Sequence, residues 1–196
     1  MRQFILLLFL LPIFGNSNAQ TPSTVPGYYV TYSNDTVYTK IKLPKSIFGG
    51  EDLSKFIYRV EIVDSFGERK KLKPEDIISY GFSHNGISHR LFSKPMMSPK
   101  NLKFLKPVIL GQKTSVYQLL TVNQSGAVLG TSYTFENTGG RFAFLVNTMS
   151  LSKFKSELKA FYKENLTVQQ LIDTKFQSKM SLQEDIIEIV KAVNGA

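Results

Sequence analysis

The sequence predicts an α+β protein. An antiparallel β-rich body (a sheet, a sandwich or a partly open barrel) is followed by two or three short C-terminal helices. Two patterns support this fold class: residues 27–149 consist of short alternating segments separated by turn residues, and residues 150–196 change to helical spacing. Because the strands come first and the helices last, separate layers are favoured over repeated βαβ units.

The first expected hairpin joins residues 28–33 to residues 36–43 through a two-residue turn, Asn34-Asp35. Both residue types tolerate the positive φ that such turns require. This register places on one face Tyr28, Val30, Tyr32, Val37, Thr39 and Ile41. Pro44 ends the second strand.

Residues 56–64 show the clearest strand pattern, since Phe56, Tyr58, Val60 and Ile62 alternate with polar residues. A basic strand follows over residues 69–73. The strongest hairpin signal is Asn85-Gly86. It joins residues 78–84 to residues 87–93, which places His84 opposite Ile87 and His89 opposite Phe82.

Residues 94–103 contain two prolines and three lysines and are expected to form a basic loop. Glycine and asparagine turns separate the strands expected after it. These strands cover residues 104–110, 115–122, 127–136 and 141–147.

Three helical segments are expected after residue 150. Apolar residues recur at helical spacing over residues 152–164. Thr167 with Gln170, and Ser181 with Glu184, have the spacing of capping boxes that open a second and a third helix. The third covers residues 182–193.

Residues 1–19 have the three-part pattern of a secretory signal peptide, with a positive start, an apolar run over residues 4–14 and a small polar end at Ala19. The apolar run is about eleven residues long, whereas a membrane span needs about twenty. We expect cleavage after Ala19, a β-rich domain over residues 20–149, and a helical segment over residues 150–196 packed on or beside it. A retained N-terminal membrane anchor is the alternative.

The chain contains no cysteine, which excludes disulfides, thiol catalysis and the lipid anchor that bacterial lipoproteins attach to a cysteine. We therefore expect a protein located in the periplasm or outside the cell, with no transmembrane segment after signal removal. The formal net charge of +9 favours anionic partners, although solubility alone also explains it. No phosphate-binding loop or RNA-binding motif is present, so we expect no cofactor and no specific nucleic acid.

His84 and His89 are the only histidines and lie diagonally on one hairpin face. They are the candidates for a catalytic site, and the alternative is that both are partly exposed hairpin residues without a catalytic role. A metal centre needs three or four ligands, and no local motif supplies them. We therefore expect no metal site.

A basic patch is the best surface candidate for binding. Its residues are Arg69, Lys70, Lys71, Lys73 and Arg90, continued by Lys94, Lys100, Lys103 and Lys106. Consecutive strands usually lie next to each other, so the groups before and after Asn85-Gly86 are expected to form one face. The alternative is an edge strand whose lysines prevent sheet-to-sheet aggregation.

Four segments of the chain are distinctive in their order: G-Y-Y-V-T-Y-S-N-D-T-V-Y at 27–38, D-S-F-G-E-R-K-K-L-K-P-E-D-I-I-S-Y-G-F at 64–82, L-K-A-F-Y-K-E-N at 158–165 and E-D-I-I-E-I-V-K-A-V-N at 184–194. In these segments the chain resembles a family of uncharacterised exported β-rich proteins from Gram-negative bacteria. The resemblance implies a signal peptide, a β-rich body and a helical tail, and it implies no activity.

Three functions follow from these observations. The first is a non-enzymatic exported binding or envelope-associated module that recognises an anionic ligand through the basic patch. The second is a small exported hydrolase with a site assembled around His84 and His89. The third is a partner of another envelope protein that binds through the C-terminal helices, so that truncation at Ser150 abolishes binding while the β body stays folded.

Overall fold

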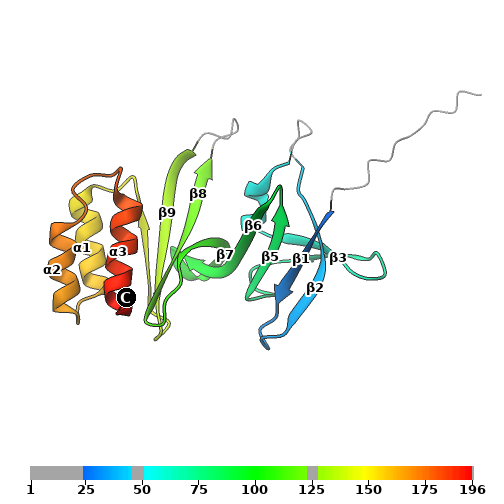
Figure 1. Ribbon diagram of the computed structural model, residues 1–196, viewed down its shortest axis with the longest axis horizontal. Coiled ribbons are helices and arrows are strands. Elements are labelled where there is room, and N and C mark those ends of the chain that lie inside the picture. The colour runs from blue at the N-terminus through cyan, green and yellow to red at the C-terminus, as the bar shows by residue number, and fades with distance from the viewer. Residues whose placement is uncertain (1–23, 46–50, 123–127, 196) are drawn as a thin grey trace, which may run out of the picture.

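The computed structural model describes residues 24–45, 51–122 and 128–195 and has an α+β fold (Figure 1). In this part of the chain, ten strands form one open antiparallel sheet and three α-helices follow it. The predicted fold class is confirmed, with the body arranged as an open sheet. The expected signal peptide lies outside the described residues. Within those residues, no helix combines the length and hydropathy needed to cross a bilayer.

The first half of the chain contains β1 Thr24–Val30, β2 Thr36–Lys42, the 3₁₀ helix η1 Leu53–Ile57, β3 Val60–Val63, β4 Arg69–Leu72, β5 Ser79–His84 and β6 Ile87–Met96. The second half contains β7 Ser98–Ile109, β8 Thr114–Val122, β9 Val128–Asn137, β10 Phe142–Val146, α1 Leu151–Phe161, α2 Leu166–Thr174 and α3 Leu182–Asn194. The strand order is β10-β9-β8-β7-β6-β5-β1-β2-β3-β4. The chain therefore builds one end of the sheet with β1–β4, returns beside β1 with β5, and extends the other end to β10.

The β5–β6 hairpin forms as predicted. Asn85 and Gly86 both have positive φ, 50° and 74°, and His84 pairs with Ile87. Phe82 pairs with His89. Asn-Gly adopts this turn readily because both residues tolerate the left-handed conformation.

The predicted register of the first hairpin is wrong. Val30 pairs with Thr36, so residues 31–35 form the loop, and Asn34 alone takes a positive φ of 67°. The backbone N–H of Asn34 donates to the carbonyl of Thr31 at 3.0 Å. Because this changes the register by an odd number of residues, it exchanges the faces of β1. Tyr29 packs against the core, whereas Tyr28 lies on the other face beside Tyr38, which is 82% exposed.

The predicted strand over residues 56–64 is also wrong in its first half. Phe56 lies in η1, and β3 begins only at Val60. The 3₁₀ turn brings both side chains into one core and leaves Tyr58 57% exposed. The phenol of Tyr80 donates a 2.9 Å hydrogen bond to the carbonyl of Phe56, which holds η1 over the sheet. This tertiary contact overrides the alternating pattern.

The predicted loop over residues 94–103 is instead part of a long hairpin. Lys94 pairs with Lys103 and Pro95 with Leu102, and the chain reverses at Met97, whose φ is 64°. The register shifts between Pro95 and Met96. Proline is tolerated here because an irregular strand end requires fewer ladder hydrogen bonds.

Three hydrophobic clusters hold the sheet together. The first joins η1 to strands β1–β7, and the second joins β8–β10 to the helices. The third lies between them and contains Phe92, Leu105, Tyr117 and Leu119. On β7, Phe104 belongs to the first cluster and its neighbour Leu105 to the third, because successive side chains of a strand point to opposite faces. β7 therefore connects the two halves of the molecule.

The helices begin close to the predicted positions, but their capping contacts differ. The Asn165 side chain, not Thr167, caps α2 by accepting from the N–H of Val168 at 3.0 Å. Ser181 precedes α3 but makes no capping bond, because its hydroxyl donates to Asp185 at 2.9 Å. Ser150 caps α1 by accepting from the N–H of Lys153.

Asn194 ties the end of α3 to the β7–β8 turn. Its Oδ1 accepts from the backbone N–H of Lys113 at 2.7 Å and of Thr114 at 3.2 Å. Its Nδ2 donates to the carbonyls of Thr114 and Val190 at 3.0 and 2.8 Å. Gly111 lies directly beneath this amide, since a Cβ there would be 2.1 Å from Nδ2.

Replacing Asn194 with Ala should lower the free energy of unfolding by about 1–3 kcal/mol, because partly buried backbone groups lose their partners. Urea denaturation followed by circular dichroism measures this. Gly111→Ala should also destabilise the wild-type protein, through its clash with the Asn194 amide. The same glycine substitution should cost less in the Asn194→Ala background, and equal costs would contradict the contact.

Candidate anion-binding site

A cavity of about 490 Å³ lies where the end of β2, η1, β3 and β4 meet. We call it the basic pocket. Its lining residues are Lys42, Leu43, Pro44, Lys45, Lys55, Phe56, Arg59, Glu61 and Arg69. Five of them carry positive charge and one carries negative charge, so the pocket attracts anions.

The strand register places two of these charges directly opposite each other. Lys42 pairs with Glu61 across β2 and β3, and their side chains form a 2.8 Å ion pair. Glu61 is the one carboxylate among the lining residues, and because it is paired with Lys42 it does not occupy the other cations of the pocket. Arg69 pairs with Val63 on the next strand pair, at the edge of the sheet. The guanidinium groups of Arg59 and Arg69 belong to exposed residues, where they are accessible to a ligand.

The floor of the basic pocket is apolar. Leu43 and Phe56 are buried, with 1% and 3% exposure. The Phe56 ring packs against Phe82 and Tyr80, with ring centroids 4.9 and 5.8 Å apart. The floor therefore belongs to a rigid core, and it can contact the apolar part of an anionic ligand.

Two contacts hold the Lys55 side chain at the pocket. The Lys55 ammonium donates to the carbonyl of Lys45 at 2.6 Å and lies 3.4 Å from the Asp52 carboxylate. A hydrogen bond from Ser54, together with Lys55, holds the pKa of Asp52 below its ordinary 3.8, against an opposing effect of burial. Asp52 thus stays ionised at neutral pH and orients the lysine.

The structure separates the residues of the predicted basic patch. Arg69 lines the basic pocket, whereas Lys70, Lys71 and Lys73 are exposed on or just after the edge strand β4. β5, β1, β2 and β3 lie between β6, which carries Arg90, and β4 in the sheet. The expectation that the two basic strands are neighbours is therefore wrong, because β5 returns to pair with β1.

Arg90 lines a smaller cavity of about 100 Å³ together with His89 and Lys106. Phe56 borders this cavity as well as the basic pocket. The Arg90 guanidinium lies over the Phe92 ring, 4.6 Å from its centroid, so part of its charge is engaged within the protein.

The two histidines lie on one hairpin face but make separate contacts. His84 Nε2 is 2.6 Å from a carboxylate oxygen of Glu51. His89 stacks on Phe82, with ring centroids 4.7 Å apart and an interplanar angle of 11°. Among the described residues, no group of three or more histidines and carboxylates is placed to hold a metal ion. No hydroxyl in the described hydrogen bonds is joined to either imidazole.

Sequence reasoning missed four cations of the basic pocket: Lys42, Lys45, Lys55 and Arg59. They come from segments that are separated along the chain and carry no local motif. The alternation of Lys42 and Arg59 with buried apolar residues was the available signal. This alternation indicates that the charged side chains point away from the core. Which of these side chains lie next to one another depends on the strand register.

Comparisons of the chain with protein-family models, curated proteins and solved structures found no match. The site is therefore interpreted from its own geometry.

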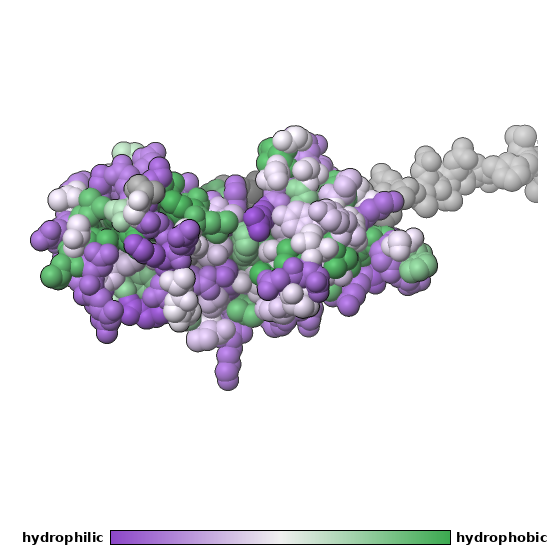
Figure 2. Space-filling view, turned by 60° about the horizontal axis from the view of Figure 1, so that its bottom comes forward, coloured by the Kyte–Doolittle hydropathy of each residue, from purple (hydrophilic) through white to green (hydrophobic). Residues whose placement is uncertain are grey.

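Hydrophilic and apolar residues are interspersed on the face shown in Figure 2. Hydrophilic residues occur on both halves of the molecule. The basic pocket is therefore distinguished by its concave shape and by the sign of its charges, and not by polarity alone.

His89 should make the protein less stable in mild acid. Burial lowers its pKa from the ordinary 6.5, and the charges of Lys106 and His84 lower it further. The unfolded chain then binds the proton more readily, so stability falls as pH decreases through the range below about 6.5. In the His89→Gln variant, the urea concentration at the midpoint of unfolding should fall less than in the wild type between about pH 7.5 and about pH 5. The exposed neighbour variant Ser88→Ala should keep the wild-type dependence, and an unchanged slope in His89→Gln would contradict this role of His89.

Proposed function

We propose that this chain is an exported, non-enzymatic binding module and that the basic pocket binds an anionic ligand of the cell envelope. The observation that carries the proposal is a concave site lined by five cations and one carboxylate, in which Lys42 is paired with Glu61, Lys55 lies beside Asp52, and Arg59 and Arg69 are exposed. Export is supported by the signal-peptide pattern of residues 1–19.

The cations are suited to an anion with several oxygens. Arginine presents a planar fork that matches phosphate or carboxylate in a bidentate manner. Arg59 precedes β3 and Arg69 begins β4, so both are attached to regular strands that reduce the entropy lost on binding. The apolar floor of Leu43 and Phe56 favours a ligand whose anionic group is joined to an apolar body.

A ligand of this kind can be a phosphorylated lipid or an acidic glycan that carries an apolar substituent. Both offer the same chemistry to the pocket, namely anionic oxygens beside a hydrocarbon or ring surface. Vesicles and soluble polyanions distinguish the two sources.

Reversing the charge of two pocket arginines should weaken binding more than reversing two lysines outside it. We expect Arg59→Glu/Arg69→Glu to raise the Kd at least about tenfold, because charge-assisted hydrogen bonds are lost. The matched control is Lys70→Glu/Lys73→Glu, which makes the same change in net charge near the same strand and should stay within about threefold of wild type.

The probes are phosphatidylcholine vesicles with and without phosphatidylglycerol, and fluorescein-labelled dextran sulfate. Binding is measured by co-sedimentation and by fluorescence anisotropy at low and high NaCl. Affinity should fall as salt rises because the charges are screened. An equal rise in Kd in both double variants would indicate binding by diffuse surface charge and would refute the pocket as the binding site. The proposal would also be refuted if the wild-type protein bound neither the anionic vesicles nor dextran sulfate.

The hydrolase is a second candidate, and it rests on one contact. The 2.6 Å pair of His84 with Glu51 resembles the orientation of a catalytic base by a carboxylate. Slow hydrolysis of p-nitrophenyl acetate that is lost in His84→Ala, but kept in Ser88→Ala, would support it. Equal rates in the wild type and both variants would exclude it for this class of ester.

An envelope-protein partner bound through the helices requires a different test from truncation at Ser150. The buried side chains of α1–α3 pack directly on β8–β10, against Val116, Tyr133, Phe135 and Leu145. Removing the helices would expose this core, so lost binding would report lost folding. Charge reversal at an exposed residue of the α1–α2 turn, such as Lys163→Glu, leaves the core intact and tests that surface directly.

A further inference from the structure

A further cavity of about 210 Å³ lies in the other half of the molecule, between the sheet and the helices. We call it the helix-side cavity. It is bordered by the start of β8, the β9–β10 turn, the end of α1 and the start of α2. The position is set by Asn194, whose amide fixes the turn that carries Lys113.

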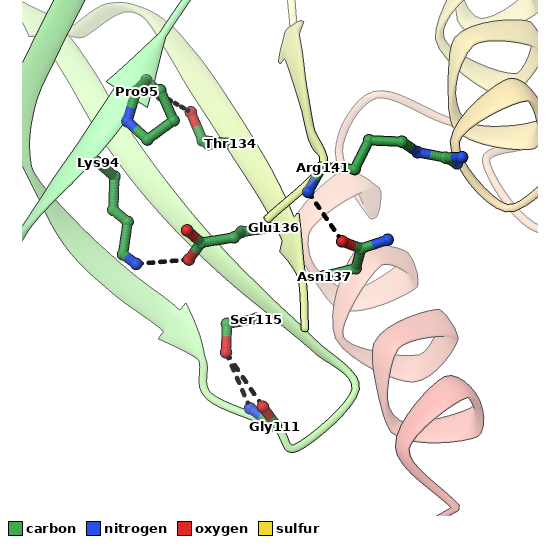
Figure 3. A network of polar contacts seen from close by, with 8 residues as sticks. All are labelled: Lys94, Pro95, Gly111, Ser115, Thr134, Glu136, Asn137 and Arg141. Atoms are coloured by element: carbon green, nitrogen blue, oxygen red, sulfur yellow. Dashed lines mark hydrogen bonds and ion pairs between the residues drawn. The ribbon is translucent and has the colours of Figure 1, made fainter. Parts of the chain in front are cut away.

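Hydrogen-bond donors point to this side of the sheet. Figure 3 shows the Arg141 side chain and the Nδ2 of Asn137 directed toward the helices. The Oδ1 of Asn137 accepts from the backbone N–H of Arg141 at 2.9 Å, which leaves Nδ2 to face the cavity. The carboxylate of Glu136 points the other way and pairs with Lys94.

The Arg141 guanidinium is held in place but keeps donors for a ligand. Its Cζ lies 5.1 Å from the centroid of the Phe161 ring, and Nη2 donates to the carbonyl of Ala160 at 3.4 Å. A guanidinium has five N–H donors, so this long bond uses only one.

Tyr162 supplies the independent observation. The residue is only 7% exposed, and its phenol oxygen is one of two buried side-chain polar atoms in the described chain that lack a hydrogen-bond partner. Burial raises the pKa of Tyr162 to about 12, against a smaller opposing effect of the Thr114 side chain, which does not meet the geometry of a hydrogen bond. Buried hydroxyls nearly always have a partner, and Tyr162 lines the cavity, so its hydroxyl is the group we assign to a bound molecule in the proposal below.

The charges around the cavity favour an anion. Lys113 and Arg141 are the cations of its lining, and Glu164 is the only carboxylate. The Glu164 side chain is 86% exposed and lies 4.0 Å from the Lys163 ammonium, so solvent and a neighbouring cation reduce its influence. Phe161 and Val193 add an apolar wall.

We propose that the helix-side cavity binds a small organic carboxylate, which takes its charge-assisted hydrogen bonds from Arg141 and Lys113 and a further one from the Tyr162 hydroxyl. The planar carboxylate matches the guanidinium fork, and the volume leaves room for a short carbon body against Phe161. The proposal is independent of the basic pocket, because the two cavities share no lining residue.

The test is a titration of the ¹⁵N-labelled full chain with benzoate, succinate and inorganic phosphate, followed by NMR. We expect saturable shifts of the Asn137 and Asn165 side-chain amides with at least one of the two carboxylates. Tyr162→Phe keeps the ring packing and removes only the hydroxyl, and it should raise the Kd about tenfold. Arg141→Gln should raise the Kd more, since it removes the charge.

The matched control is Lys191→Gln, which removes one exposed positive charge on α3 from a residue that lines neither cavity, and it should leave the carboxylate Kd unchanged. An equal Kd for Tyr162→Phe and wild type would overturn the proposal, because the hydroxyl would then serve structure or an ordered water only. Phosphate binding as tight as the carboxylates would overturn the ligand class. A lack of shifts at both amides with all three probes would overturn the site.

Discussion

Strand β7 is the constraint on which the rest of the structure depends. It pairs with β6 on one side and β8 on the other, and its adjacent residues Phe104 and Leu105 are both fully buried in different clusters. A strand can do this because its side chains alternate between faces. One continuous hydrogen-bonded sheet thereby joins the half of the molecule that is covered by η1 to the half that is covered by the three helices (Figure 1).

Each half covers its exposed sheet face in its own way. In the first half, η1 places Phe56 over Tyr80 and Phe82, and the aromatic contacts with the Tyr80 hydrogen bond fix this short segment. In the second half, three helices supply the cover and Asn194 fastens the last of them. A cavity forms beside each cover, where irregular backbone meets regular strands and charged residues can surround apolar side chains. This common origin explains why both candidate sites combine cations with an apolar wall.

Local sequence patterns predicted the structural features that are set by residues close together in the chain. The Asn85-Gly86 turn, the change from strands to helices and the helix starts follow from turn chemistry and periodicity. They did not predict the place of Phe56, because its position in η1 is fixed by contacts with Tyr80 and Phe82, which lie on the distant strand β5. The register of β1 with β2 was missed for a similar reason, since Asn34 can close loops of different lengths. For the site, Arg69 was predicted, while its partners from η1 and β3 were not.

The sequence by itself determined the α+β class, the absence of disulfides and the order of strands and helices, because composition and periodicity are properties of the chain. Only the tertiary structure decided which charges meet. Lys42 faces Glu61, and Arg59 shares a pocket with Arg69, because β3 pairs with β2 on one side and with β4 on the other. Tyr162 acquires its unpaired hydroxyl in the same manner, from the docking of α1 on the sheet. Strand pairing and helix docking join residues that are far apart in the chain, so no local sequence pattern encodes them. Both also bury polar groups, and a polar group that is removed from water costs free energy unless it finds a partner.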